Sequence, residues 1–207
     1  MNSVILMGDV IDSNDQPQSK LMDEFKGVVQ FSNGQYKDEI ISPLTITLGD
    51  EFQGIVDSIN TGVMTIILIE EQMIERNLDF KIRYVLHEGD IETEINKERA
   101  YEMLGEGLTK ARDELNGLKK SSSRFHFSLK TEPTSNSLNK LFKLLQFFLD
   151  GWFQKDRTTV SGFLKGLNYK EVAKIEKKDE SSLWRRRRSL AIDEYFTCKS
   201  LIYEAIR

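Results

Sequence analysis

The sequence predicts an α+β domain of the ferredoxin-like type, followed by an all-α domain. In the first 132 residues, short apolar or alternating runs typical of strands are interleaved with segments of helical periodicity. From residue 138 onward, helical periodicity alone remains. A chain of 207 residues with 39% hydrophobic content can build one large core or two small ones. We therefore expect domains at 1–132 and 138–207, separated by the polar segment 131–137.

The expected order in the first domain is strand, helix, hairpin, helix, strand pair, helix and strand. We expect the helices to cover one face of a mainly antiparallel sheet. The first helix should end at a polar turn at 32–34. The segments are, in order, a strand at 4–7, a helix at 20–30, a hairpin at 44–56, a helix at 61–76, strands at 80–87 and 91–95, a helix within 97–115 and a strand at 124–129.

Two aspartates are candidate metal ligands. Asp9 follows a glycine at the end of the first strand, and Asp50 follows a glycine in the hairpin turn. Strands that end this way can bring both side chains to one end of the sheet. Paired carboxylates suit Mg²⁺ or Mn²⁺, which commonly bind one or two carboxylates together with nucleotide phosphates. The alternative is that Asp50 is an ordinary turn residue.

The second domain begins with an apolar stripe at helical spacing between 138 and 152. This pattern predicts a core or interface helix, and it is a candidate dimer interface. Shorter helices are expected at 158–165, 169–175 and 180–188, with a Gly-containing turn between the first two. Three short helices with these spacings are typical of a helix-turn-helix.

The third of these helices has serines in its first turn and four consecutive arginines after them. A helix of this kind suits DNA, because its polar N-terminal end can meet base edges while the arginines bind phosphates. The alternative is a solvated or acid-paired helix face. The residues expected at or near the groove are Ser181, Ser182, Trp184, Arg185, Arg186 and Arg188.

Charge is distributed unevenly along the chain. Residues 156–207 contain 12 Lys or Arg and 8 Asp or Glu, which is a net charge of +4. Because the whole chain has a net charge of −4, the residues before them carry a net charge of −8. This asymmetry suggests that the two parts of the chain have different tasks. A single cysteine, the absence of a spanning apolar stretch and the absence of a secretory signal together predict a cytoplasmic protein without a membrane anchor.

With these motifs in place, the chain resembles the SatD-like family of bacterial proteins. The resemblance rests on Gly8-Asp9 with Asp12-Ser13 after it, the 48–53 block, Ile82-Arg83, the 105–115 helix with Ala111-Arg112, and the closing helix-turn-helix. It implies a DNA-binding or regulatory protein.

The first domain is also similar in motif order to the palm-like fold of nucleotide cyclases and GGDEF diguanylate cyclases. This resemblance implies metal ligation by Asp9 and Asp50 and a catalytic arginine at Arg112. The chain departs from the cyclase pattern at Leu108, where cyclases place an asparagine, and at Leu48, which replaces a glycine. Asp12 and Asp15 also lie where a triphosphate would be bound. These departures favour nucleotide binding over turnover.

Three functions remain open at this point. The first is a homodimeric DNA-binding regulator whose first domain senses a nucleotide with Mg²⁺ or Mn²⁺. The second is a metal-dependent nucleotidyl cyclase or a related phosphoryl-transfer enzyme. The third is a scaffold that binds only protein. DNA affinity at low salt separates the first from the third, and metal-dependent product formation identifies the second.

Overall fold

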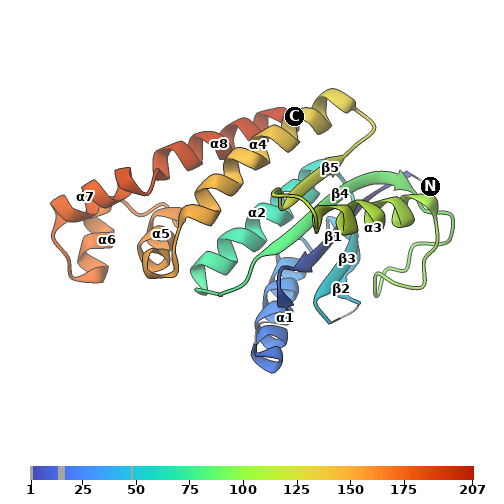
Figure 1. Ribbon diagram of the computed structural model, residues 1–207, viewed down its shortest axis with the longest axis horizontal. Coiled ribbons are helices and arrows are strands. Elements are labelled where there is room, and N and C mark those ends of the chain that lie inside the picture. The colour runs from blue at the N-terminus through green and yellow to red at the C-terminus, as the bar shows by residue number, and fades with distance from the viewer. Residues whose placement is uncertain (1, 14–16, 48) are drawn as a thin grey trace.

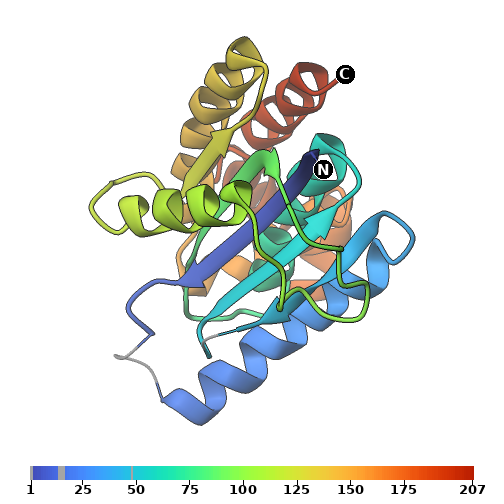
Figure 2. The same cartoon turned by 90° about the vertical axis from the view of Figure 1, so that its right-hand side faces the viewer.

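A computed structural model of the chain describes residues 2–13, 17–47 and 49–207, so Asp15 and Leu48 lie outside the described residues. Its strands form one sheet in the order β2-β3-β1-β4-β5 (Figures 1 and 2). Neighbouring strands pair antiparallel, except that β4 and β5 are parallel. The strands are β1 (Asn2–Val10), β2 (Ile40–Ile46), β3 (Glu51–Val56), β4 (Ile82–Asp90) and β5 (Phe125–Ser128).

Helices lie on both faces of this sheet. Val4 and Leu6 of β1 belong to the hydrophobic cluster that α1 (Gln18–Gln35) and α2 (Ile59–Glu75) complete. Ile5 and Met7 belong to a second cluster on the opposite face, which α3 (Glu106–Leu118) covers (Figure 2). The prediction that all helices cover one face is therefore wrong for α3. Because successive side chains of a strand point to opposite faces, the unbroken apolar run of β1 needs cover on both.

The first helix does not end at the predicted polar turn, because its polar groups are used within the fold. Ser32 is buried in α1, and its hydroxyl donates to the Val28 carbonyl at 3.1 Å. The Asn33 side chain donates to the Leu44 carbonyl at 2.9 Å and accepts from the Leu44 amide at 2.8 Å. The polar side chains of this last turn therefore support the helix and anchor β2 rather than turning the chain.

The segment between β4 and α3 also differs from the prediction. β4 runs to Asp90, which pairs with Asn2 of β1, so the predicted turn at 87–90 is part of the strand. Residues 91–95 form no strand, and the helix predicted within 97–115 begins only at Glu106. Ile91 and Ala100 in this loop are buried in the α3-side cluster. Their apolar character reflects burial of a loop against the sheet, which periodicity alone cannot distinguish from regular structure.

The C-terminal part of the chain is helical, as predicted. Residues 132–137, placed by the sequence in a polar boundary segment, are the first turns of α4 (Glu132–Gly151). The stripe on α4 is buried in the chain's own core, where α4 packs against β5 and α8. The remaining elements are the 3₁₀ turn η2 (Gln154–Asp156), α5 (Arg157–Leu164), α6 (Tyr169–Glu176), α7 (Glu180–Ser189) and α8 (Ile192–Ala205).

One hydrophobic cluster extends from β1 through α4 to α8, so the two parts of the chain share a core. Polar contacts reinforce this packing. The Tyr195 hydroxyl donates to Glu71 of α2 at 2.8 Å, and the Lys199 ammonium lies 2.6 Å from the same carboxylate. The Trp152 indole donates to the Leu190 carbonyl at 2.8 Å. The assignment of separate domains at 1–132 and 138–207 remains a prediction. Among the described residues, no helix has the length and apolarity needed to cross a bilayer.

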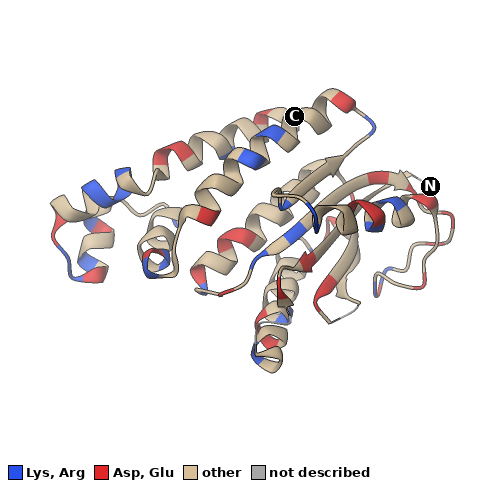
Figure 3. Cartoon of the chain, viewed as in Figure 1, with Lys and Arg blue, Asp and Glu red and all other residues tan. Residues whose placement is uncertain are grey.

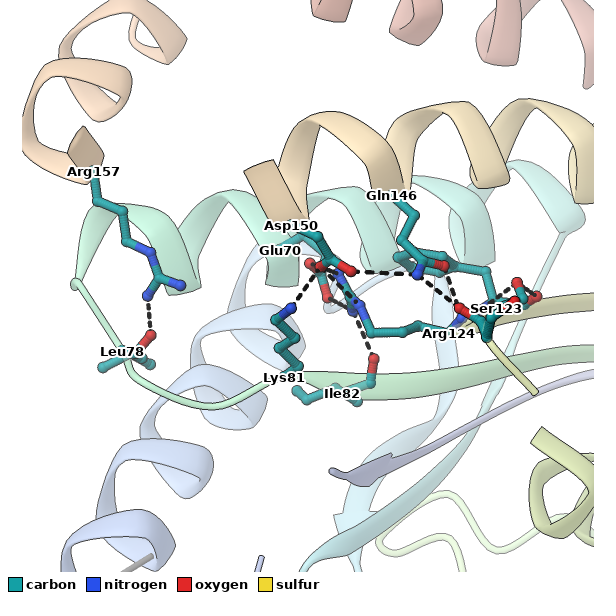
Figure 4. Close-up of polar contacts among 11 residues, drawn as sticks. Glu70, Leu78, Lys81, Ile82, Ser123, Arg124, Gln146, Asp150 and Arg157 are labelled. Carbon is teal, nitrogen blue, oxygen red and sulfur yellow. Dashed lines mark hydrogen bonds and ion pairs between the residues drawn. The ribbon is translucent and has the colours of Figure 1, made fainter. Parts of the chain in front are cut away.

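A buried arginine links four elements where β4 and β5 begin (Figure 4). Arg124 donates to both carboxylate oxygens of Glu70 in α2, each at 3.0 Å. It also donates to Asp150 of α4 at 3.1 Å and to the Ile82 carbonyl of β4 at 2.7 Å. Because both partners of the Arg124–Glu70 pair are only 6% exposed, removal of either would leave a buried charge without its main partner.

We expect Glu70→Ala to lower the free energy of unfolding by about 3 kcal/mol, because Arg124 would keep only Asp150 as a charged partner. Glu75→Ala is the matched control. Glu75 lies on the same helix, and its ion pair with Lys165 joins two exposed side chains, so its loss should cost about 0–1 kcal/mol. Urea unfolding of both variants measures the difference. Equal losses would contradict the structural importance of the buried pair.

Candidate functional site

The two Gly-Asp segments meet at one end of the sheet. Asp9 lies near the end of β1 and pairs in register with Glu51, the first residue of β3. The Val10 amide donates to the Asp50 carbonyl at 2.9 Å, so the backbones at Asp9 and Asp50 are neighbours. Gly49 has a φ of +86°, a conformation that glycine adopts without strain and that turns the hairpin. The structure therefore brings both predicted segments to the same place.

The side chains of these aspartates have different partners. Asp9 is 3% exposed, and its carboxylate lies 3.3 Å from Arg83 and 3.6 Å from the Lys119 ammonium. The Asp50 carboxylate instead accepts a hydrogen bond from the Ser13 hydroxyl at 2.6 Å. It lines a separate cavity of about 170 Å³ next to α1. Adjacent backbones therefore hold the two carboxylates in separate hydrogen-bonding environments.

Arg112 contacts the same end of the sheet from α3. Its guanidinium donates to Glu51 at 2.5 Å and to the Gln53 side chain at 3.2 Å. The Lys119 ammonium lies 3.9 Å from the Glu51 carboxylate and 3.6 Å from the Asp9 carboxylate, so it bridges these two acids. Sequence reasoning missed Glu51, although its position next to Asp50 and opposite Asp9 in a hairpin was a usable signal. It also missed Arg83 and Lys119, whose approach depends on strand pairing and helix docking.

Burial raises the pKa of Asp9, while the opposing charges of Arg83 and Lys119 lower it and Glu51 raises it further. The Oδ1 atom of Asp9 is buried and has no hydrogen-bond partner among the described residues. An unpartnered carboxylate oxygen fits a cation or a proton donor. Across the described residues, no group of three or more His, Cys, Asp or Glu side chains is arranged to hold a metal ion. The chain therefore offers only part of a metal ligand set here.

The second candidate site is built from the three short helices α5, α6 and α7. Gly166, with a φ of +81°, turns the chain after α5, and Asn168 and Glu171 form a capping box that begins α6. Lys177 ends α6 in the left-handed conformation, and Asp179 caps α7 by accepting from the Ser182 amide. The helix boundaries predicted from the sequence agree with these elements to within a residue or two.

Packing of these helices leaves most of α7 exposed. Leu183 is the buried residue of α7, and it joins Val172 and Ala173 of α6 in the core. Ser181 and Ser182 are exposed in the first turn of α7, and Trp184 is 46% exposed. Basic residues occupy the second half of this helix, as Figure 3 shows.

The four arginines of α7 have different environments. Arg186 forms an ion pair with the buried Asp156 of η2, and Arg187 lies 2.6 Å from Asp193 of α8. Arg185 makes no hydrogen bond or ion pair within the described part of the chain. Arg188 lies over the Trp184 ring at 5.2 Å and is likewise not paired with an acid there. Arg186 therefore contacts Asp156 within the fold while its side chain stays 39% exposed, and its place at or near a DNA groove remains a prediction.

Comparison with solved structures gives matches over part of the chain. The chain is similar to a bacterial light-regulated adenylyl cyclase, with 12% identity, a TM-score of 0.44, and coverage of 61% of this chain and 74% of that one. It is also similar to the guanylate cyclase domain of RhGC from Catenaria anguillulae in complex with GTP, with 13% identity, a TM-score of 0.41, and coverage of 61% and 77%. No curated protein matches the sequence.

A family model matches nearly the whole sequence. It is the model of the SatD family, and the match extends over residues 3–206. It therefore includes the sheet, the acidic end of β1 and the C-terminal helices together. On this match, the chain belongs to the SatD family.

Proposed function

We propose that this SatD-family protein is a DNA-binding regulator that uses α7 as its recognition helix. The observation that carries the proposal is the contrast among the α7 arginines. Arg186 and Arg187 form ion pairs with acids of neighbouring elements, whereas Arg185 and Arg188 form no direct ion pair among the described residues, and Arg185 has only a longer-range attraction to Asp179. An arginine without an intramolecular acid can neutralise a backbone phosphate and release its condensed counterions.

The arrangement around α7 supports the same role. A helix-turn-helix reads bases with the N-terminal residues of its recognition helix, and α7 has Ser181 and Ser182 exposed at that end. Hydroxyl groups can donate to or accept from base edges, so they suit readout in the major groove. Trp184 and Arg188 form one exposed surface beside these serines. The ion pairs of Arg186 and Arg187 fix the angle at which α7 projects from the fold.

Binding by one such module is usually weak, so we propose that the protein acts as a homodimer in the cytoplasm. The buried stripe of α4 is not available for this contact. On other sides of α4, Leu144 is 56% exposed and Phe147 is 75% exposed, and these two residues are the part of the helix that a second copy can reach. A dimer would place two α7 helices on successive half-sites.

A second candidate function is metal-assisted nucleotide binding at the acidic end of β1. The unpartnered Oδ1 of Asp9 favours it, because a Mg²⁺ or Mn²⁺ ion would satisfy this atom. When bound, such an ion would neutralise phosphate charge. Asp9 would bind the ion, and Asp50 would join it by exchanging its bond to Ser13 for the metal. Arg112 is paired with Glu51, which favours binding of a nucleotide as an effector over its turnover by a cyclase-type reaction.

We predict that Arg185→Ala combined with Arg188→Ala weakens DNA binding. The slope of the logarithm of the binding constant against the logarithm of the salt concentration should also fall in magnitude by about 2, because each lost phosphate contact lowers this slope by about 0.9. Fluorescence anisotropy with a random-sequence duplex, titrated at several salt concentrations, measures both quantities. Lys20→Ala combined with Lys26→Ala is the matched control, since these exposed side chains on α1 carry the same total charge.

Unchanged affinity in the arginine variant, or equal loss in the lysine control, would contradict recognition through α7. Absence of DNA binding by the unaltered protein at low salt would favour the scaffold that binds only protein.

We predict that a nucleoside triphosphate with Mn²⁺ raises the thermal unfolding midpoint, since a ligand bound to the folded state stabilises it. At tenfold excess over its dissociation constant the gain is about 1.4 kcal/mol, or roughly 3–6 °C for a chain of this size. Asp9→Asn and Asp50→Asn should each abolish the shift, whereas Asp23→Asn on the exposed side of α1 should keep it.

A shift that persists in Asp9→Asn would exclude a metal site at this end of the sheet. Incubation of the same samples followed by chromatography tests turnover, and a metal-dependent product that is lost in Asp9→Asn would favour the enzyme over the sensor.

A further inference from the structure

A cavity of about 450 Å³ lies where β4 and β5 begin, bounded by the end of α4 and the start of α5 (Figure 4). Its volume is in the range of small-molecule sites. Neither Asp50 nor any residue of α7 lines it. The basic lining residues are Lys81, Arg83, Arg124 and Arg157, and serines 121–123 and Gln146 contribute neutral polar groups.

Arg157, the first residue of α5, is the group in this cavity that lacks sufficient partners. One of its terminal nitrogens donates to the Leu78 carbonyl. Its Nε atom is buried and has no hydrogen-bond partner among the described residues. Arg124, elsewhere in the same lining, is instead bonded to Glu70, Asp150 and a carbonyl group. Two arginines of one cavity therefore differ in that only Arg124 has a full set of acceptors.

The two guanidinium groups also differ electrostatically. Burial lowers the pKa of Arg157, and the nearby charges of Asp79 and Glu70 offset this effect only in part. In Arg124 the effect of burial is outweighed by Glu70 and Asp150, so its pKa is raised. A half-buried guanidinium with too little negative charge around it is stabilised by an anion that enters from solvent.

The acids of the lining do not remove this need. Asp150 is already shared between Arg124 at 3.1 Å and Lys81 at 3.3 Å. Asp12 and Asp79 are exposed, so water screens their charge. The Gln146 side chain donates to the Ser122 carbonyl at 2.9 Å and holds the serine loop against α4. Within that loop, Ser121 and Ser123 use their hydroxyl groups in local hydrogen bonds, and Ser122 is exposed at the cavity.

We infer that this cavity binds the phosphate group of a small ligand, with Arg157 as the main cationic contact and Lys81 as the second, while the 121–123 loop, on the other side of Arg124, contacts the rest of the ligand (Figure 4). A planar guanidinium can donate parallel hydrogen bonds to phosphate, and the terminal nitrogens of Arg157 are the donors that a ligand can reach, because Nε is buried. Neither Asp9 nor Asp50 lines this site, although Arg83, which lines it, also pairs with Asp9, and binding to the site requires no metal ion. It also stands independently of DNA binding, because none of its lining residues belongs to α6 or α7.

Isothermal titration calorimetry of the full chain in EDTA tests the inference, with inorganic phosphate, ribose 5-phosphate and AMP as probes and ribose and adenosine as phosphate-free controls. We expect saturable binding of the phosphate-bearing probes alone. Equal affinity for all three would identify the phosphate ion itself as sufficient, and tighter binding of an ester would show that the rest of the cavity recognises the organic part. No saturable binding of any probe up to the millimolar range would overturn the inference.

Two variants test the contacts. Arg157→Gln should weaken phosphate binding by about tenfold to a hundredfold, the range expected for loss of a charge-assisted hydrogen bond. Its control is Arg76→Gln, because Arg76, at the C-terminal end of α2, lies over the Phe31 ring of α1, outside the cavity. Ser122→Asp adds a repelling charge at an exposed loop position without disturbing the core, and Ser137→Asp, on an exposed part of α4, is its control.

Circular dichroism confirms that each variant is folded. Undiminished phosphate binding in both Arg157→Gln and Ser122→Asp would overturn the assignment of the site to this cavity.

Discussion

Burial of β1 on both faces is the constraint on which the architecture depends. Ile5 and Leu6 are fully buried, and Met7 is 1% exposed, so neighbouring side chains of the same strand lie in two different hydrophobic clusters. A strand of this kind must lie inside the sheet and must be covered from both sides. The helices α1 and α2 supply one cover, and α3 with the loop before it supplies the other. The same burial raises the pKa of Asp9, because the opposing charges of Arg83 and Lys119 offset the loss of water around its carboxylate only in part.

The elements predictable from the sequence are those whose pattern is local. The hairpin around Gly49 and the three short helices near the C-terminus have their turn residues and caps within a few positions, and they lie where expected. The apolar run at 4–7 also contained the information that both faces are covered, although the expected arrangement left one face open. Apolar residues in the 91–105 segment were misleading, because a loop buried against the sheet uses the same side chains as a strand or helix.

The parts that sequence reasoning missed are contacts between distant positions. Asp9 and Arg83 are 74 residues apart, and their approach requires the pairing of β1 with β4. The four arginines of α7 look equivalent in the sequence, but they are distinguished by Asp156 and Asp193, which belong to other elements. Arg124 shows the same dependence, because its partners come from α2, β4 and α4. The location of the acidic site was predictable from its motifs, whereas the partners of each charge were not.

The bonds from α8 to Glu71 have a consequence for how the chain folds. One bond joins residues that are 124 positions apart in the sequence, and the other joins residues that are 128 positions apart. The chain between these residues, which includes the helices between α4 and α8, therefore forms one long loop. Closing such a loop is slow, because its entropy must be lost before the contact is gained. During synthesis on the ribosome, the sheet and α1 to α3 emerge first and can fold as a unit, and Phe142 of α4 can pack on Phe125 and Phe127 of β5 soon afterwards. The side of α4 that contacts α8 stays uncovered until α8 has been synthesised, so this part of the shared core is the last to close.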